Sequence, residues 1–261
     1  DIKQLNKIKF SSFFSKKKVA NYYERLYYLK QKKGNSTIYM CISKDSKKII
    51  ENKIPNSNCV FFPNAVNIDN FKAVNRKIGG TIKLISIGSF YKKKGHSLLL
   101  KTLSKLNEIS NLKFELHLIG DGELKNKLLE DTKKLKLIEK VIFHGMVTNP
   151  EKYLQNAHLY VHSASYEPFG LVLIEAMSTG LPVISTDGRG NKDIVNESNG
   201  ILLNHRDPYK YAKEILSLIL NPDNYKSKVK GALKTAEKYD ITSYVDKLLK
   251  FYDSEIKLMK S

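Results

Sequence analysis

Six short apolar stretches alternate with segments of helical pattern through the middle of the chain, between residues 81 and 204. They are TIKLISIG, FELHLIG, VIFHG, HLYVHS, LPVISTD and GILLN. Most are rich in β-branched residues, and polar or glycine-containing loops follow them; strands that alternate with helices in this way are typical of a parallel sheet covered on both faces. The pattern therefore predicts an α/β fold with a doubly wound, Rossmann-like parallel sheet, in which ligands bind at the carboxyl ends of the strands.

The flanking segments predict further elements. After the last strand we expect three helices, over about residues 207–220, 223–238 and 241–258, with a break at NPDN. Before the first strand we expect a helix over about residues 17–32, followed by strands in STIYMCIS and CVFFP.

These elements divide the chain into three parts. Two strands cannot make a doubly wound sheet, and the chain begins at Asp1 without a methionine. We therefore interpret residues 1–65 as a partial N-terminal domain whose upstream half is missing, with a small native cap as the alternative. Residues 66–240 form the sheet domain, and residues 241–261 form a C-terminal helix.

One mostly apolar run, EPFGLVLIEAMSTGLPVISTD, ends in clear helix stop signals. The run is free of proline from Phe169 to Thr179, and Gly180 and Pro182 follow it. Pro168 suits the first turn of a helix, where its missing N–H has no partner to lose. We therefore expect the helix to begin near Phe169.

Two glutamates eight positions apart flank the start of this helix. The amides of Phe169, Gly170 and Leu171 would be unpaired at the positive end of the helix dipole, where a phosphate binds well. Glu175 lies about 7.5 Å further along the axis, comparable with the separation of a nucleotide's phosphates from its ribose hydroxyls. A carboxylate accepts hydrogen bonds from two adjacent hydroxyls. Together with Glu167 in the entry loop, this predicts a nucleotide-sugar site; two solvated glutamates are the alternative.

Charge and cysteine content narrow the class of protein. The net charge is +19, but all except four of the 45 basic residues are lysines. Nucleic-acid readers favour arginine forks, so we expect no nucleic-acid partner, and the lysines fit an AT-biased coding sequence, an anionic membrane surface or polyphosphate substrates. Cys41 and Cys59 have neither metal-site nor disulfide spacing, which favours a reducing cytoplasm. We also find no D-x-D motif and expect no metal and no cofactor.

Four spaced motifs resemble a known family. E-x7-E at Glu167 and Glu175, GSFYKKKGHSLLL, IGDGE and FFPNAVNIDNF occur in the order found in family 4 (group 1) retaining glycosyltransferases of GT-B fold. The resemblance runs from about residue 36 to the C-terminus. It implies a nucleoside-diphosphate-sugar donor and a glycan or lipid-linked acceptor in cell-surface polysaccharide or glycolipid assembly. It also implies that FFPNAVNIDNF joins the acceptor domain to the donor domain, and that the last helix crosses back.

The resemblance assigns roles around the glutamate pair. Glu167 resembles the catalytic glutamate that faces the donor sugar and the reacting centre. Glu175 resembles the residue that binds the ribose diol. Phe169, Gly170 and Leu171 would offer backbone amides to the sugar and the diphosphate.

It also assigns roles in two other loops. Lys94 resembles the lysine that neutralises the diphosphate leaving group, and Gly88 begins the same loop. Ser89 stands where many relatives have an arginine, so the fork of donors to the pyrophosphate is lost here. Met146 and Val147 would contact the base through their backbone, which leaves the base unidentified.

The sequence thus predicts a glycosyltransferase located in the cytoplasm and peripheral on the inner face of the plasma membrane. The alternatives are a non-catalytic nucleotide-binding or partner-docking half, or a GT-B nucleotide-sugar epimerase. His162, at the end of a strand, is interpreted as structural. On the C-terminal helix we expect an exposed apolar surface around Tyr244, Leu248 and Tyr252.

Overall fold

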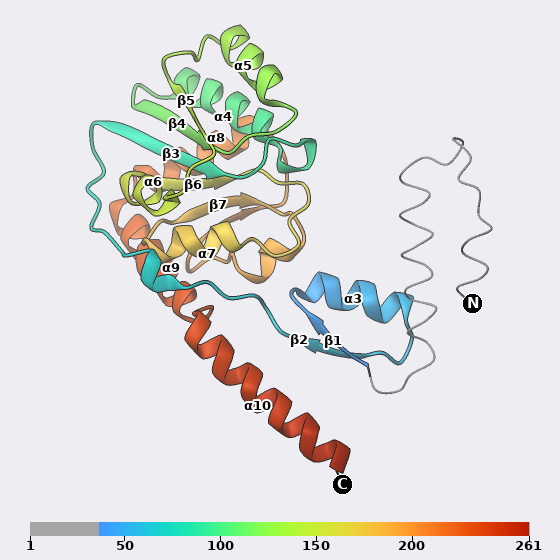
Figure 1. Ribbon diagram of the computed structural model, residues 1–261. Helices are drawn as coiled ribbons and strands as arrows, with labels where there is room; N and C mark the ends of the chain where they lie inside the picture. Colours follow the sequence, from blue (N-terminus) through green and yellow to red (C-terminus); the bar gives the residue numbers. More distant parts are fainter. Residues whose placement is uncertain (1–36, 261) are drawn as a thin grey trace, which may run out of the picture.

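The computed structural model describes residues 37–260, so the helix expected over residues 17–32 lies outside the described residues. Six parallel strands form one sheet in the order β5-β4-β3-β6-β7-β8 (Figure 1). The strands are β3 (Thr81–Ile87), β4 (Lys113–Ile119), β5 (Val141–Gly145), β6 (Leu159–His162), β7 (Val183–Thr186) and β8 (Gly200–Leu203). All six apolar stretches are strands, and the order reverses between β3 and β6. The predicted doubly wound sheet is confirmed, and β3 and β6 mark its switch point.

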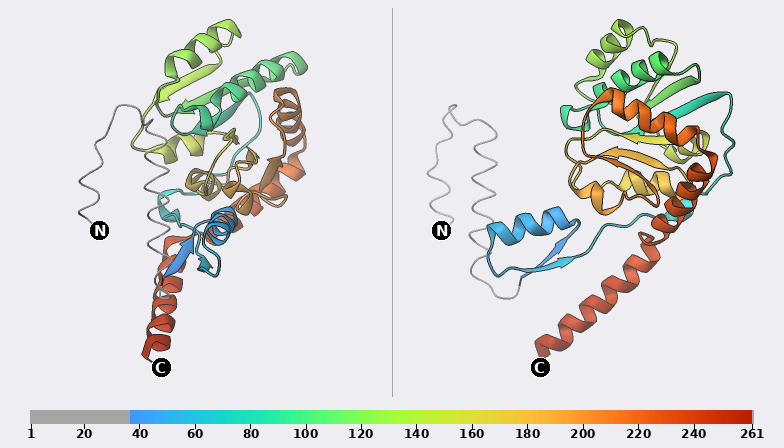
Figure 2. Two further views of the ribbon diagram at one scale, coloured as in Figure 1. Left: turned by 90° about the vertical axis from the view of Figure 1, so that its right-hand side faces the viewer. Right: turned by 180° about the vertical axis from the view of Figure 1, so that it is seen from behind.

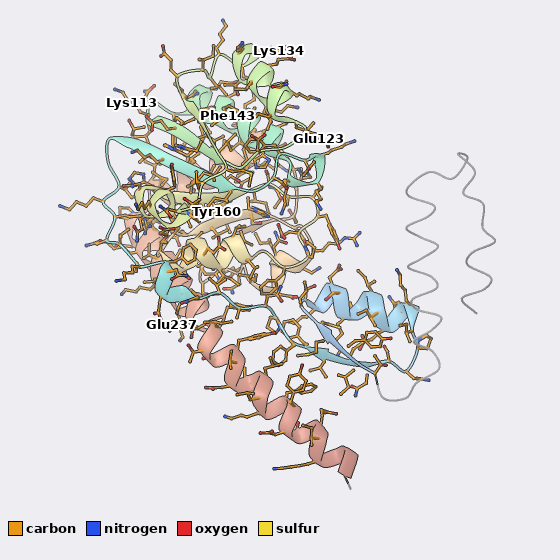
Figure 3. All side chains as sticks on the ribbon, in the orientation of Figure 1. Lys113, Glu123, Lys134, Phe143, Tyr160 and Glu237 are labelled. Atoms are coloured by element: carbon orange, nitrogen blue, oxygen red, sulfur yellow. The ribbon has the colours of Figure 1, made fainter. Side chains whose placement is uncertain are left out.

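Helices cover both faces of this sheet, as Figure 2 shows from two further sides. One face packs against α4 (His96–Ile109), α5 (Lys125–Lys134) and α8 (Pro208–Ile219). The other packs against α6 (Pro150–Asn156), α7 (Leu171–Ser178) and α9 (Pro222–Glu237). Side chains fill the space between these layers, and Tyr160 lies near the middle of the sheet (Figure 3).

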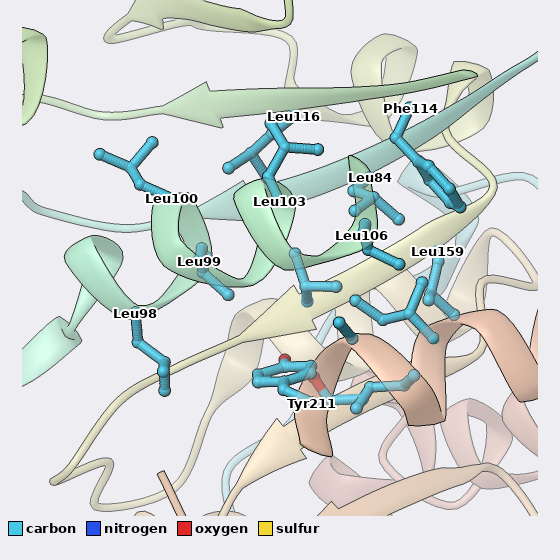
Figure 4. Packing of buried hydrophobic residues seen from close by; sticks show 14 of the residues in the cluster. Leu84, Leu98, Leu99, Leu100, Leu103, Leu106, Phe114, Leu116, Leu159 and Tyr211 are labelled. Carbon is cyan, nitrogen blue, oxygen red and sulfur yellow. The ribbon is translucent and has the colours of Figure 1, made fainter. Parts of the chain in front are cut away.

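The leucines of α4 pack this helix against the first face of the sheet. Leu99, Leu103 and Leu106 recur three or four residues apart, so they lie on one face of the helix, and all three are buried. Figure 4 shows them between the strands and Tyr211 of α8. Burial of each such side chain stabilises the fold by about 1.5–3 kcal/mol.

A separate two-stranded parallel sheet precedes the main one. It consists of β1 (Ile38–Cys41) and β2 (Asn58–Phe61), joined by α3 (Lys44–Lys53). Both expected strands are confirmed. The apolar pattern does not predict α3, because none of its residues is buried; its signal is the capping box in which Ser43 and Ser46 bond each other's backbone. The β1–α3–β2 unit lies to one side of the main sheet (Figure 1).

The last expected helices are confirmed as α8, α9 and α10 (Ile241–Lys260). The helix α10 extends away from the main sheet (Figure 1). Near its start, Tyr244 packs edge-on against Phe62, with ring centroids 4.9 Å apart. Among residues 37–260, no helix combines the length and hydropathy needed to cross a bilayer.

The apolar surface expected on α10 is wrong for two of its three members. Tyr244 and Leu248 are half-buried, and Tyr244 faces the segment that includes and follows the end of β2. The exposed apolar row lies beside them and includes Tyr252 with four residues one helical turn apart, namely Ile241, Val245, Leu249 and Ile256.

Candidate functional site

The helix α7 begins later than expected. Its first residue is Leu171, not Phe169, because Gly170 adopts the left-handed conformation (φ 105°, ψ 58°) and interrupts the helix. Pro168 therefore precedes the helix by three residues, and its expected first-turn position is wrong. Glu167 belongs to the entry loop, as expected, and Glu175 belongs to the helix body.

A neighbouring loop holds the backbone of Glu167 on both sides. The amide of Glu167 donates to the carbonyl of Gly188 at 2.7 Å, and the amide of Gly190 donates to the carbonyl of Glu167 at 3.0 Å. A side chain at Gly190 would collide with the carbonyl of Pro168. We call residues 187–193, which follow β7, the 187–193 loop. Its close approach fixes the direction in which Glu167 points.

Lys94 and Glu167 form an ion pair although they come from different loops. Lys94 Nζ lies 2.6 Å from Glu167 Oε2, and both side chains are largely buried. Lys94 ends a short 3₁₀ turn before α4. Two backbone contacts tie its loop to the loop after β6: Ser163 Oγ donates to the Lys94 carbonyl at 2.9 Å, and the Ser165 amide donates to the Lys93 carbonyl at 2.8 Å. The switch point of the sheet thus brings together the two residues expected to be catalytic.

The charges around Glu167 set its protonation. Burial alone raises the pKa of this carboxyl, but hydrogen bonding to His162 and to Lys94, together with the positive charge of Lys94, outweighs burial and holds the pKa at about 2. Glu167 is therefore ionised at neutral pH.

His162, which the sequence interpretation treats as structural, lies against Glu167 in this site. Its side chain is buried, and Nε2 lies 3.4 Å from Glu167 Oε2, a long contact for a hydrogen bond. Burial lowers the pKa of the imidazole, which favours the neutral form. The sequence feature that indicates a place near the site is the position of His162 at the carboxyl end of β6, at the switch point of the sheet.

Glu175 is half-buried on α7. It lies four residues beyond the first helical residue, about 6 Å along the axis. Burial raises the pKa of its carboxyl. Burial is the main cause that raises the pKa of Tyr160, and the negative charges of Glu175 and Glu167 raise this pKa further. Tyr160 Oη accepts from the amide of Ile87 and donates to its carbonyl at the end of β3, so the residue on which both glutamates act is tied to the switch point.

The turn before α7 leaves three amides unpaired. Within the described residues, the N–H groups of Phe169, Gly170 and Leu171 donate to no backbone or side-chain acceptor. They lie beside Glu167 at the N-terminal, positive end of α7. This is the environment expected for a phosphate or another anion.

The remaining expected residues lie in two places. Gly88 follows β3, and the Lys94 side chain passes beside it; Ser89 follows in the same loop and is half-buried. Met146 and Val147 lie after β5 instead, where Met146 is 85% exposed and both line a shallow groove of about 650 Å³. The structure therefore brings Gly88, Ser89 and Lys94 together, and keeps the expected base contacts three strands away from β6.

No metal-binding cluster is present in residues 37–260: no three His, Cys, Asp or Glu side chains gather closely enough to hold an ion. His117 and His144 on β4 and β5 do lie close together, with ring nitrogens 2.9 Å apart and Glu115 beside His117. That group is away from the Lys94–Glu167 pair. The expectation that no metal is required remains a prediction.

The six-stranded sheet has the fold of one half of a GT-B glycosyltransferase. Residues 67–235 match the family model described as glycosyl transferases group 1, and the chain belongs to this family. The chain is 32% identical to Protein CapJ of Staphylococcus aureus over 75% of its own length and 50% of that protein.

The chain is also similar to a further relative and to a solved structure, the latter in fold. One is the N-acetylgalactosamine-N,N'-diacetylbacillosaminyl-diphospho-undecaprenol 4-alpha-N-acetylgalactosaminyltransferase of Campylobacter jejuni, 30% identical over 70% of the chain and 51% of that enzyme. The other is the structure of a TarM variant of S. aureus in complex with fondaparinux, alpha-GlcNAc-glycerol and UDP. It superposes with a TM-score of 0.73 at 24% identity, over 93% of the chain and 48% of TarM. The chain thus spans about half the length of these relatives.

Proposed function

We propose that this chain is the donor-binding half of a retaining glycosyltransferase that moves a sugar from a nucleoside diphosphate to a hydroxyl of a glycan or lipid-linked acceptor. The observation that carries the proposal is the Lys94–Glu167 pair, 2.6 Å apart at the switch point of the sheet, beside three unpaired amides of the α7 turn. This arrangement combines a carboxylate for the sugar with donors for a leaving diphosphate. The proposed retention of configuration at the anomeric carbon rests on family membership alone.

Each group has a place in the proposed chemistry. Lys94 and the amides of Phe169, Gly170 and Leu171 bind the diphosphate and stabilise the charge that develops as it leaves; removal of one such donor costs about 2.7–4 kcal/mol in comparable sites. Glu167 orients the sugar and stabilises the positive charge at its anomeric carbon. When the diphosphate binds, it competes with Glu167 for Lys94.

The nucleoside lies along the edge of the sheet in this proposal. Glu175 accepts hydrogen bonds from the ribose diol, and Gly88 and Ser89 lie beside the pyrophosphate. Met146 and Val147 contact the base. Three strand spacings of about 4.8 Å separate β5 from β6, or roughly 14 Å, which is comparable with the length of an extended nucleoside diphosphate.

Residues 66–240 would form the donor domain and residues 1–65 an acceptor-side part, with α10 crossing back to it. The Campylobacter relative, named for a lipid-linked acceptor, supports an acceptor of that kind. The charge of +19 supports a cytoplasmic enzyme bound at the anionic inner face of the plasma membrane.

The test begins with calorimetric titration of the 261-residue chain with UDP-, GDP- and ADP-sugars. We expect one base to bind with a dissociation constant of hundreds of micromolar, about 5 kcal/mol, because the described residues form one wall of the site and leave the diphosphate near solvent. Absence of binding by all three would contradict a donor site.

The intact gene product then separates the alternatives. A transferase consumes donor only with an acceptor and forms a product of unchanged anomeric configuration, visible by NMR. An epimerase alters the donor sugar without acceptor. A non-catalytic half binds the nucleotide and does neither.

A further inference from the structure

The 187–193 loop, which holds Glu167, also contacts the β1–α3–β2 unit. Asp193 Oδ2 accepts a hydrogen bond from the backbone amide of Lys44 at 2.7 Å. Lys44 is the first residue of α3, so this amide has no partner inside its own helix. A carboxylate of the main sheet thus satisfies the end of a helix in the other unit.

Arg189 makes a second contact to the same helix. Its Nη1 lies 4.0 Å from Asp45 Oδ2, in the first turn of α3. Its backbone (φ 82°, ψ −77°) has the conformation of the rare γ-turn, which is strained for a residue with a side chain. Its two neighbours, Gly188 and Gly190, are the residues that bond the backbone of Glu167.

The loop has a firm anchor on the sheet side. Asn191 is fully buried; its side chain accepts from the Gly188 amide at 2.8 Å and donates to the Thr186 carbonyl at 2.7 Å. The loop is therefore fixed to β7 through Asn191 and to α3 through Asp193. The contacts to Glu167 are made by Gly188 and Gly190, on either side of the strained Arg189.

We propose that Asp193 is a positioning residue: by binding the N-terminus of α3 it holds the 187–193 loop in its strained form and so sets the position of Glu167 for sugar transfer. This inference rests on the proposed function. According to this inference, Glu167 has the position needed for sugar transfer only while the β1–α3–β2 unit contacts the 187–193 loop. Without the contact to α3, the strained backbone at Arg189 relaxes, and Gly188 and Gly190 move away from their places beside Glu167.

Two substitutions break this contact from opposite sides. Asp193→Ala removes the acceptor. Lys44→Pro removes only the donor, because proline is favoured at the first helical position and the extended Ser43 suits a residue before proline. Asp193→Asn keeps an acceptor oxygen. Asn221→Ala is the matched control, since it removes the oxygen that accepts from the Asn224 amide at the start of α9.

Amide hydrogen exchange of the 261-residue chain tests the positioning without any activity. We expect the Glu167 and Gly190 amides to exchange about tenfold faster than in the native chain in both Asp193→Ala and Lys44→Pro. The double variant should exchange at the same rate as either single variant. Asp193→Asn and Asn221→Ala should exchange near the native rate. Native exchange at Glu167 in both single variants overturns the inference.

Turnover of the intact gene product tests the consequence. We expect kcat to fall at least fivefold in Asp193→Ala and Lys44→Pro, while the KM for the donor stays within twofold of the native value. In Asp193→Asn we expect kcat to be near the native value. Equal losses of kcat and nucleotide affinity, or the same loss in Asn221→Ala, overturn it. If the native protein transfers no sugar, the proposed function fails, and the exchange rates still decide whether α3 positions Glu167.

Discussion

At the scale of single residues, the site is held by one short ion pair whose members are expected to separate during the reaction. Lys94 neutralises Glu167 at 2.6 Å, and both side chains are mostly out of solvent, so the pair is less screened than a surface salt bridge. Under the proposed function, a diphosphate carries more charge than a carboxylate and would compete for Lys94. His162 Nε2, 3.4 Å from Glu167 Oε2, would then remain beside the carboxylate.

Glu175 gives a direct test of the nucleotide site. We expect Glu175→Ala to weaken binding of the nucleoside diphosphate by about 1.5–3 kcal/mol, because it removes a charged acceptor for the ribose diol. Calorimetry with the nucleoside diphosphate measures the loss. The exposed Glu130→Ala serves as control. Unchanged affinity in Glu175→Ala would count against the ribose assignment.

Glu167 predicts a pH dependence of stability. Its folded pKa, about 2, is below the ordinary value of 4.5, so the ionised form stabilises the fold. The contribution is fully present above about pH 4.5 and is lost as the pH falls toward 2; it amounts to at most about 3 kcal/mol.

Urea unfolding at pH 6, 4 and 3 measures this contribution. We expect Glu167→Gln to flatten the fall in the free energy of unfolding between pH 4.5 and 3, whereas Glu130→Gln, at an exposed carboxyl, leaves it unchanged. A native slope in Glu167→Gln would refute the assignment of this titration to Glu167.

At the scale of elements, the apolar pattern was enough to predict the six strands and the three last helices, because burial alternates with loops in a regular way. The start of α7 was not predictable in this way. Pro168 and the apolar run favour an earlier helix, but the contacts of Glu167 with Gly188 and Gly190, more than twenty residues later, hold Glu167 in an isolated β-bridge, and Gly170 turns the chain.

The site was predictable only in part for a related reason. Sequence spacing related Glu167 to Glu175, since both belong to one segment. The pairing of Lys94 with Glu167 depends on two loops that meet at the switch point, so sequence spacing could not predict it. The order of the motifs was the only sequence evidence that both residues act in the same reaction. His162 carries no spacing signal, and its contact with Glu167 arises from the turn between β6 and α7.

The C-terminal ends of α6 and α7 meet at one half-buried arginine, Arg76, which ties the incoming segment to the donor sheet. Its guanidinium donates to the carbonyl of Leu154 in the last turn of α6 at 3.0 Å, to that of Ala157 just after α6 at 2.7 Å, and to that of Thr179 just after α7. A cation at helix C-termini is favourable. Burial lowers its pKa to about 10, so it remains charged at neutral pH.

We expect Arg76→Ala to lower the free energy of unfolding by about 3 kcal/mol, because several carbonyls lose a charged donor at once. Arg76→Lys should recover less than half, since one ammonium cannot reach all of them. Urea denaturation measures both. Lys77→Ala, which removes an exposed charge from the same segment, should be near native. An equal effect at Lys77 would show that charge, not the guanidinium fork, is responsible.

At the scale of the whole molecule, the donor sheet carries its core on both faces and its site on one edge, whereas α10 lies away from it (Figures 1 and 2). One side of α10 packs on Phe62 through Tyr244 and Phe251. The other side has no apolar neighbour among the described residues that would cover its row of Ile241, Val245, Leu249, Tyr252 and Ile256, each at least 36% exposed. Under the proposed organisation, acceptor-side residues cover this row.

The 261-residue chain alone should therefore self-associate through α10. A continuous apolar row of this length is unfavourable in water, and pairing of two copies would bury it. We expect sedimentation velocity to show a concentration-dependent dimer or larger species that Leu249→Gln with Ile256→Gln reduces strongly, because these changes remove the middle and the end of the row. Asp246→Asn, on an exposed position outside it, should leave association unchanged. A chain that remains monomeric at millimolar concentration, or a double variant that associates like the native chain, would show that this row is not an interface.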